Sequence, residues 1–286
     1  MEQKPFTVTN PLTKHFRTPA IYLKLPSQGS YWPTPSITIP ANGEIPVLPM
    51  TTKDEIIIKT PDALLNGQGV ISTIQSCCPS ITNAWDMPSI DVDAIIIAIR
   101  IASYGNSMEF TSTCPHCKEE SDYAMDLSII LESIKAPNYE QTIPYNDLTI
   151  KLKPQSYLSL NHARMINFEE QQILRTLEEM DDDNRLENQA RFDTHLQNIV
   201  ELQLDSLSNS TDYILTNDGV KVTDTTFIKE FYQNCDNNII KEIKKLLEQF
   251  VNESKIKPLP VNCHHCEKQF EVSIEFDWSS FFANGS

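Results

Sequence analysis

The sequence predicts an α+β fold that is mainly helical. It combines an N-terminal extended arm, a helical body, and a small split zinc-ribbon β module that closes around a helical insertion. Three observations predict this: prolines are concentrated near the N-terminus, helix-start signals recur between residues 51 and 257, and two Cys-x-x-Cys pairs each lie between short β-patterned segments. The expected segments are an arm at 1–50, a helical core at 51–107, a zinc ribbon at 108–128 plus 259–278, a β-hairpin at 138–155, and a helical insertion at 156–257.

The arm holds half of the 18 prolines of the chain. Proline lacks a backbone donor and favours extended conformations. Large apolar residues such as Phe6, Phe16, Tyr22 and Trp32 interrupt the prolines, and basic residues outnumber acids. An extended segment of this composition needs a surface to cover. That surface is either the body of the same chain or a neighbouring subunit, and the sequence leaves both open.

Helices are expected from Thr52 onward. Residues 51–55 read as a capping sequence with acids in the first turn, and Thr60-Pro61 repeats the signal with proline at the first helical position. A third helix is expected near 68–78. Residues Ser89–Tyr104 form the strongest helix pattern, with Gly105 just past its end. Its isoleucines are numerous enough to predict a buried central helix.

The two cysteine pairs, Cys114/Cys117 and Cys263/Cys266, predict a single structural zinc site with four sulfur ligands. Residues 118–262 separate the pairs. Closing such a loop costs roughly 4 kcal/mol, whereas structural zinc contributes about 10–16 kcal/mol in small peptides. The separation is therefore no obstacle, and four protein ligands leave the metal no position for water or substrate.

Other interpretations of these cysteines remain open at this stage. The pairs could be reduced turns without metal, or could bind zinc together with another chain. Disulfides are less favoured because the sequence shows no secretory signal. His116, His264 and His265 lie between the cysteines, and short turns of this kind normally direct the intervening side chains outward. A mixed site with one histidine ligand is the remaining variant.

Residues between the cysteine pairs predict further elements. A helix is expected at 126–135 and a hairpin at 142–152 with its turn at Asn146-Asp147. Ser156 is expected to cap a long helix through about Met180, followed by a second helix at 187–208. A short strand near 220–222 and helices at 225–235 and 237–253 complete the insertion. Residues 169–183 carry seven acids and one arginine, so they form either a solvated turn or a partner surface.

Composition excludes several classes of function. The net charge is −16 and the sequence pI is about 4.7, without the basic stripe that phosphate binding requires, so we expect no nucleic-acid partner. The most apolar run, Ile95–Ala102, is too short to span a membrane and contains Arg100. We expect no membrane association. We also expect that the protein is synthesised and kept in a reducing cytoplasm.

Catalytic motifs are not found in the sequence. It has no nucleophile elbow and no zinc-protease motif, and the glycines at 67 and 69 lack the lysine and the preceding strand of a phosphate loop. Cys77, Cys78 and Cys235 are expected to be small buried groups. We therefore expect no enzymatic activity and no small-molecule substrate.

Several sequence segments of the N-terminal half, together with the cysteine turns, resemble the baseplate hub proteins of T-even-like contractile-tailed bacteriophages. The resemblance covers about residues 17–130 and rests on Thr18–Tyr31, Leu48–Glu55, Lys59–Gly67, Met87–Ala94, Tyr104–Gly105 and Cys114–Cys117. The stretch from about 156 to 257 shows no such resemblance.

The resemblance implies a structural part of the phage tail baseplate, made in the infected bacterium and located in the virion. Its partners would be other baseplate and tail subunits, or further copies of this chain. An assembly factor that is absent from the finished virion is the main alternative, and a zinc-ribbon protein associated with nucleic acid is the second.

Overall fold

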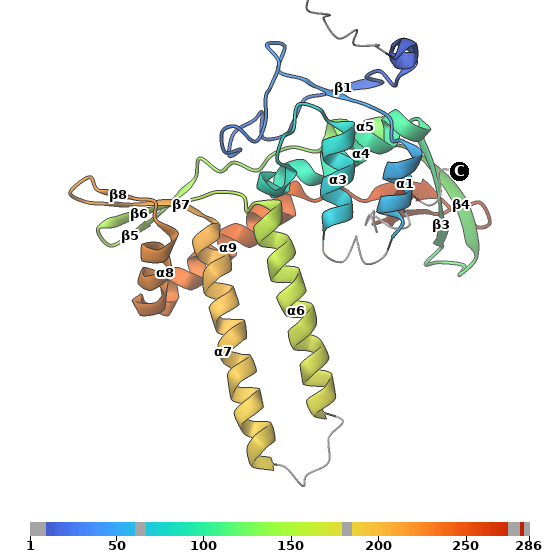
Figure 1. Cartoon of the computed structure of the whole chain (residues 1–286). Coiled ribbons are helices and arrows are strands. Elements are labelled where there is room, and N and C mark those ends of the chain that lie inside the picture. Colours follow the sequence, from blue (N-terminus) through green and yellow to red (C-terminus); the bar gives the residue numbers. More distant parts are fainter. Residues whose placement is uncertain (1–9, 61–66, 179–184, 274–280, 283–286) are drawn as a thin grey trace, which may run out of the picture.

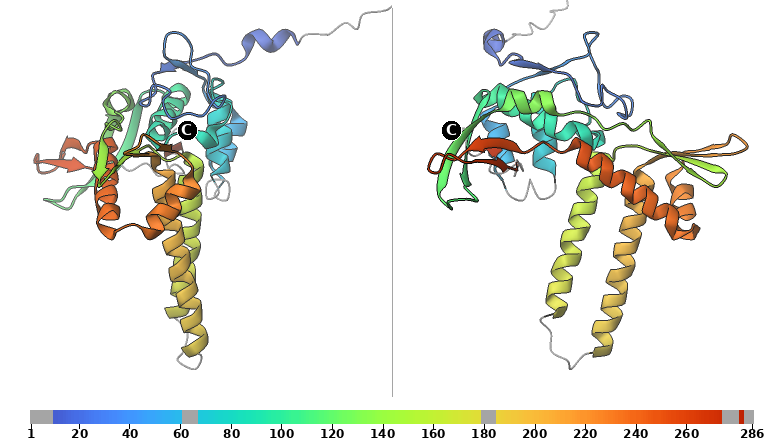
Figure 2. Two further views of the ribbon diagram at one scale, coloured as in Figure 1. Left: turned by 90° about the vertical axis from the view of Figure 1, so that its left-hand side faces the viewer. Right: turned by 180° about the vertical axis from the view of Figure 1, so that it is seen from behind.

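The computed structural model describes residues 10–60, 67–178, 185–273 and 281–282, and shows an α+β protein with small antiparallel sheets. A helical body lies at one side, with the two cysteine-bearing hairpins at its edge (Figure 1). A four-stranded sheet with two helices lies at the other side, and a long pair of helices projects between them (Figures 1 and 2). Among the described residues, no helix is both long and apolar enough to cross a membrane.

Helix α4 (Ser89–Tyr104) is the centre of the body, as its sequence predicts. Most of its side chains are buried, and Gly105 ends it with a positive φ of 89°. Helix α3 (Gln68–Cys77) packs beside it, and α1 (Thr52–Ile58) begins with the predicted capping box between Thr51 and Asp54. The second helix start, at Thr60-Pro61, lies mostly outside the described residues.

The surface that residues 20–47 cover is the body of the same chain. Strand β1 (Ile21–Leu23) pairs with β2 (Ile45–Val47), and Leu23 and Leu25 are in the main core. A buried carboxylate also fixes this segment. Asp91 of α4 accepts hydrogen bonds from the Ser27 backbone N–H (2.8 Å), the Ser27 hydroxyl (2.5 Å) and the Trp32 indole N–H (2.8 Å).

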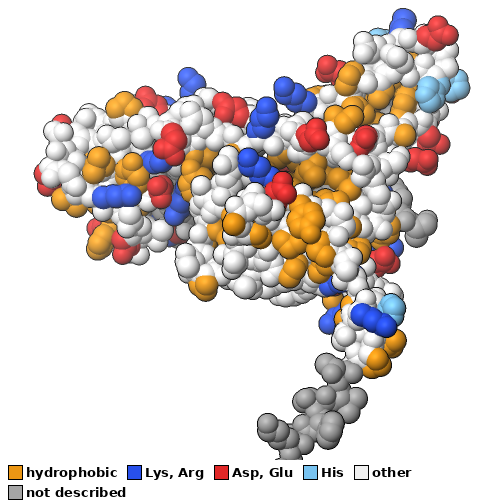
Figure 3. All heavy atoms as spheres, turned by 90° about the horizontal axis from the view of Figure 1, so that it is seen from above, with side chains coloured by type: hydrophobic (Ala, Val, Ile, Leu, Met, Phe, Trp, Pro, Cys, Tyr) orange, Lys and Arg blue, Asp and Glu red, His pale blue; other side chains and the backbone are white. Residues whose placement is uncertain are grey.

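Within the described residues of the expected arm, a 3₁₀ helix, η1 (Pro11–His15), and its flanks stand clear of the body. Helix η1 has no buried residue, and Leu12 and Phe16 are 61% and 60% exposed. Figure 3 shows this segment extending beyond the rest of the molecule, with hydrophobic, basic and histidine side chains on its surface. Residues 1–9, which include Phe6, lie outside the described part.

The predicted hairpin forms, but it is not a separate unit. Strands β5 (Thr142–Tyr145) and β6 (Leu148–Leu152) pair around Asn146-Asp147. Strand β6 then pairs with β7 (Thr211–Thr216), which pairs with β8 (Lys221–Val222), so strands from both sides of the long helices share one sheet. This sheet and the helices α8 (Thr225–Asn234) and α9 (Asn237–Ser254) surround a second core.

Helices α6 (Tyr157–Glu178) and α7 (Arg185–Asn209) form the projecting pair. The Ser156 hydroxyl accepts a hydrogen bond from the Ser159 N–H, as expected for a cap. Gln155 fixes the base of the pair, because its amide donates to the hydroxyls of Ser206 and Ser210 at 2.7 Å each. Of the predicted acidic stretch 169–183, residues 169–178 belong to α6, and residues 179–183 lie outside the described residues.

A contact that the sequence does not predict lies at the far end of the chain. Phe281 and Phe282 are buried in the main core. The guanidinium of Arg100 donates a hydrogen bond to the Phe281 carbonyl and lies 5.1 Å from the centre of the Phe281 ring. This contact explains how arginine is tolerated inside the apolar run of α4, since its charge faces a carbonyl and an aromatic face.

Candidate metal centre

Two β-hairpins carry the four cysteines. Strands β3 (Ser107–Thr113) and β4 (Glu120–Asp126) form one hairpin, and β9 (Leu259–Asn262) and β10 (Gln269–Val272) form the other. The first hairpin follows α4 directly, and the second follows α9. Their position beside the helical body is visible in Figure 2. The predicted ribbon range extends to residue 278, of which 274–278 lie outside the described residues.

The two cysteine turns have the same backbone hydrogen bonds. The N–H of Cys114 donates to the Glu119 carbonyl, and the N–H of Lys118 donates to the Cys114 carbonyl, at 2.9 Å each. The corresponding bonds of the second turn join Cys263 to Lys268 and Glu267 to Cys263, at 3.0 Å each. Lys118 and Glu267, which follow the second cysteine of each pair, both have positive φ, 65° and 59°. Two unrelated stretches therefore fold into equivalent turns.

The turns also aim backbone donors at sulfur. The N–H groups of His116 and His265 each lie 3.4 Å from the Sγ of the first cysteine of their own pair. A thiolate is stabilised by such donors, just as a carboxylate is. Hydrogen bonds from the N–H groups of Cys266 and His265 lower the pKa of Cys263, whereas burial and the neighbouring sulfurs raise the pKa of Cys117. This arrangement suits a sulfur that carries negative charge.

The four sulfurs converge between the hairpins. Cys114 Sγ lies 3.8 Å from Cys266 Sγ, and Cys117 Sγ lies 3.5 Å from Cys263 Sγ. All four sulfurs lie within 4.8 Å of one another, and none forms a disulfide. Zinc bonds sulfur at about 2.3 Å, so tetrahedral ligands lie ~3.8 Å apart. The spacing of the four sulfurs fits a metal ion with four sulfur ligands, and the cluster could bind one.

Burial and aromatic contacts support the cluster. Cys114 and Cys263 are buried, whereas Cys117 and Cys266 are half-buried. The ring of Tyr123, on β4, lies 6.0 Å from the ring of Phe270 on β10 and 4.9 Å from the ring of His264. These rings join the two hairpins next to the sulfurs. The sequence analysis did not predict the roles of Tyr123 and Phe270. The alternation of apolar and polar residues along β4 and β10 could have indicated that both side chains face inward.

The histidines of the turns lie outside the cluster. His116, His264 and His265 are exposed, as predicted, and the sulfur cluster is complete without them. Cys77 and Cys78 are buried in the main core, where burial raises the pKa of Cys77 to about 12. Cys235 is half-buried at the end of α8. These three thiols therefore pack in or against the other cores and do not belong to the four-cysteine cluster.

The sequence model of the family described as T4 bacteriophage base plate protein matches residues 21–283. The chain belongs to this family. The match includes both hairpins and all of the helical insertion, and it begins at β1, so η1 precedes it. Curated proteins and solved structures gave no match. This match confirms the resemblance to T4-like baseplate proteins that was noted for residues 17–130. It also extends the similarity through the helical insertion. Family membership indicates a phage tail baseplate role.

Proposed function

We propose that this baseplate protein is a non-enzymatic structural component of the hub region, built into the virion and made in the host cytoplasm. Its partners would be other baseplate and tail subunits or further copies of the chain. Membership of the baseplate family supports the general role. The segment around η1 carries the finer proposal, because it offers apolar side chains that the chain itself leaves uncovered.

The chemistry of this segment suits an attachment point. Leu12 and Phe16 lie four residues apart and are largely exposed, and Lys14, His15 and Arg17 accompany them. Arg17 is held by Asp54, the Pro49 carbonyl and Ser76, so the segment leaves the body from a fixed point. A permanent interface buries apolar side chains of this size, and the basic side chains favour an acidic neighbour.

We further propose that Cys114, Cys117, Cys263 and Cys266 hold one structural zinc ion. Zinc would supply a closed, redox-inactive cross-link between the two hairpins. The protein's own groups position the sulfurs, donate N–H groups to them and cover them with Tyr123 and Phe270. Metal analysis of the purified chain tests this, with about one zinc per chain expected. Iron in a stoichiometric amount would contradict the choice of zinc.

The alternative is an assembly factor that leaves before the virion is complete. The projecting pair α6 and α7 favours it, because a long acidic extension offers a surface for reversible binding (Figure 1). Purified tails separate the two functions. A stoichiometric band of this protein in finished tails supports the structural component, whereas a band confined to tail precursors supports the assembly factor.

A deletion of residues 2–16 tests the role of the N-terminal segment. It removes η1 and keeps Arg17 with its hydrogen bonds, so the shortened chain should fold and keep its metal. Tails assembled in its presence should lack the protein. Deletion through residue 30 is unsuitable, because it also removes Leu23, Leu25 and Ser27 from the body. Normal incorporation of the 2–16 deletion would contradict the proposed joint.

A further inference from the structure

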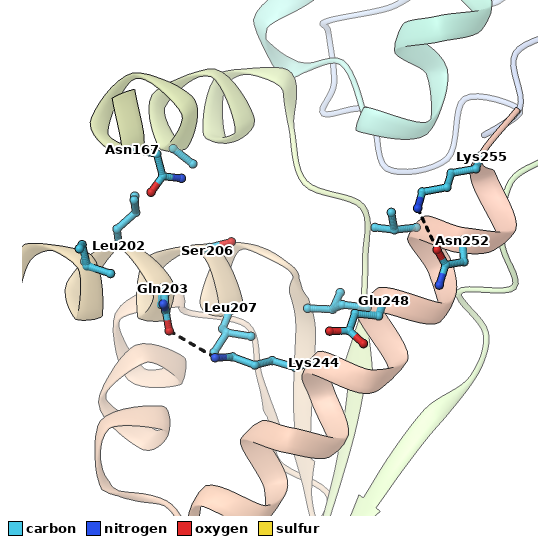
Figure 4. Close-up of a pocket in the computed structure, with 13 residues that line it drawn as sticks. Asn167, Leu202, Gln203, Ser206, Leu207, Lys244, Glu248, Asn252 and Lys255 are labelled. Atoms are coloured by element: carbon cyan, nitrogen blue, oxygen red, sulfur yellow. Dashed lines mark hydrogen bonds between the residues drawn. The ribbon is translucent and has the colours of Figure 1, made fainter. Parts of the chain in front are cut away.

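An apolar groove lies between α6, α7 and α9, away from the metal centre. Its volume is about 650 Å³. The apolar part of its lining comes from all three helices and comprises Ala163, Ile199, Leu202, Leu207, Leu247 and Val251. Figure 4 shows the side chains of α7 facing those of α9 across the open space. The helices therefore present hydrophobic faces to a space that none of them fills.

The lining follows helical periodicity on two of the walls. On α9 it recurs at Lys244, Leu247, Glu248, Val251, Asn252 and Lys255, and on α7 at Ile199, Leu202, Gln203, Ser206 and Leu207. Spacings of three and four residues form one continuous stripe along a helix. From Lys244 to Lys255, the residue that caps the end of α9, the stripe covers eleven residue steps, which is about 16 Å at 1.5 Å per step. Two facing stripes of this length match the contact surface of another helix.

Among the apolar residues of the lining, Val251 is the most exposed. Val251 is 55% exposed, although α9 buries Ile243 and Phe250 on its other side. Leu202 and Leu207 are already buried, whereas Ile199 and Leu247 are half-buried. An occupant that covered Ile199, Leu247 and Val251 would therefore gain hydrophobic stabilisation.

Charges along the edge indicate the chemistry of the occupant. The charged residues of the lining are Lys244, Glu248 and Lys255. Lys244 donates a hydrogen bond to the side-chain oxygen Oε1 of Gln203 at 3.3 Å, and Lys255 donates one to the side-chain oxygen Oδ1 of Asn252 at 3.0 Å. Neither ammonium forms an ion pair within the part of the chain that the structure describes. The rim is thus net positive on a chain of net charge −16.

We propose that this groove binds an amphipathic helix of another baseplate subunit, a partner that rests on the proposed function. The helix would place apolar residues at i, i+3 or i+4, and i+7 against Ile199, Leu247 and Val251. It would place acids opposite Lys244 and Lys255 and a basic residue opposite Glu248. The distance between the two acids along the helix would be about three turns, because Lys244 and Lys255 are eleven residues apart.

A photo-crosslinking experiment tests the groove. The full chain carries p-benzoylphenylalanine at position 251, or at Phe227 as the control, since Phe227 is 62% exposed on α8 and outside the groove. Infected cells are irradiated, and the crosslinked peptide is sequenced from both tails and tail precursors. The expected result is a crosslink from position 251, but not 227, to one segment of another baseplate subunit with the predicted apolar and acidic spacing.

Charge variants show whether the rim selects that segment. Lys244→Glu combined with Lys255→Glu should lower the crosslink yield from position 251 at least five-fold. Lys241→Glu is the matched control, because Lys241 is an exposed residue of α9 outside the lining. A crosslink to a second copy of the chain, to a segment without the spacing, or no crosslink at all would overturn the proposal. Incorporation into tails is measured separately, so a protein confined to precursors would refute the structural role without affecting this test.

Discussion

The Sγ atoms of Cys117 and Cys263 lie 3.5 Å apart although 146 positions separate them in the sequence. This distance is far longer than the ~2.05 Å of a disulfide and close to the ~3.8 Å between sulfurs that share one tetrahedral zinc. Between them in the chain lie the four-stranded sheet and the four helices α6 to α9. Any ion held by these sulfurs would therefore join the two ends of this insertion.

Replacing Cys114 and Cys263 together with serine should abolish metal binding and destabilise the protein. Each hairpin then loses its buried sulfur, and the loop between them is no longer closed. Structural zinc contributes about 10–16 kcal/mol against a closure cost of roughly 4 kcal/mol, so the net loss should lower Tm by more than about 10 °C for a chain of this size. Metal content and thermal unfolding provide the two measurements. Cys235→Ser, which changes a half-buried thiol outside the cluster, is the control, and an unchanged melting curve in the double variant would argue against a structural site.

Substituting Leu12 and Phe16 together with alanine should reduce incorporation into tails without changing stability. Neither side chain is buried in the chain, so the free energy of unfolding should change by less than about 0.5 kcal/mol. Quantification of the protein in purified tails, with thermal unfolding of the isolated chain, provides the comparison. Ile56→Ala, which alters another exposed apolar residue, should leave incorporation normal. Equal incorporation of the wild type, the Leu12→Ala/Phe16→Ala double variant and Ile56→Ala would refute the attachment role of the N-terminal segment.

Replacing Asp91 with alanine should loosen the segment that covers α4. The Ser27 N–H and the Trp32 indole N–H would lose their acceptor in a buried position, which costs about 1–3 kcal/mol for each group. Urea unfolding should therefore show a free energy of unfolding lower by roughly 2–6 kcal/mol. Asp122→Ala, at an exposed position of β4, is the control. Wild-type stability in Asp91→Ala would show that these hydrogen bonds do not hold the segment.

Asp91 also predicts a dependence of stability on pH. Burial raises the pKa of Asp91 above its ordinary value of 3.8. The native state therefore binds this proton more tightly than the unfolded state does, and the resulting stabilisation is lost as the pH rises through the native pKa. The stability of the wild type relative to Asp91→Asn should decrease as the pH increases from about 4, as measured by urea unfolding at several pH values. A relative stability that increases with pH would contradict the raised pKa.

Local signals predicted much of this structure. Three correctly predicted features depend only on residues that are neighbours in the sequence. They are the capping box at Thr51, the buried helix that ends at Gly105, and the turns at the cysteine pairs. The convergence of the four cysteines was also predictable, because four thiols in two equivalent turns have few other uses in a chain without disulfides. Whether they bind zinc remains a prediction.

Features that depend on distant partners were not predicted. Strand β7 follows α7 almost directly, with no glycine or proline to mark a change, and its pairing with β6 is decided only by the folded chain. The contact between Arg100 and Phe281 joins residues 181 positions apart. The groove beside α9 requires three helices to be placed in space. Such relationships are set by tertiary packing, which sequence periodicity does not encode.

The placement of the two cysteine turns has a consequence for synthesis on the ribosome. A polypeptide that stops just before Cys266 contains helix α1 and helices α3 to α9 but cannot bring four sulfurs together. Closure of the cluster therefore marks a chain whose translation has passed through residue 266. If attachment to the tail requires the two hairpins to be joined through the four sulfurs, prematurely terminated polypeptides would not be incorporated into assembling tails.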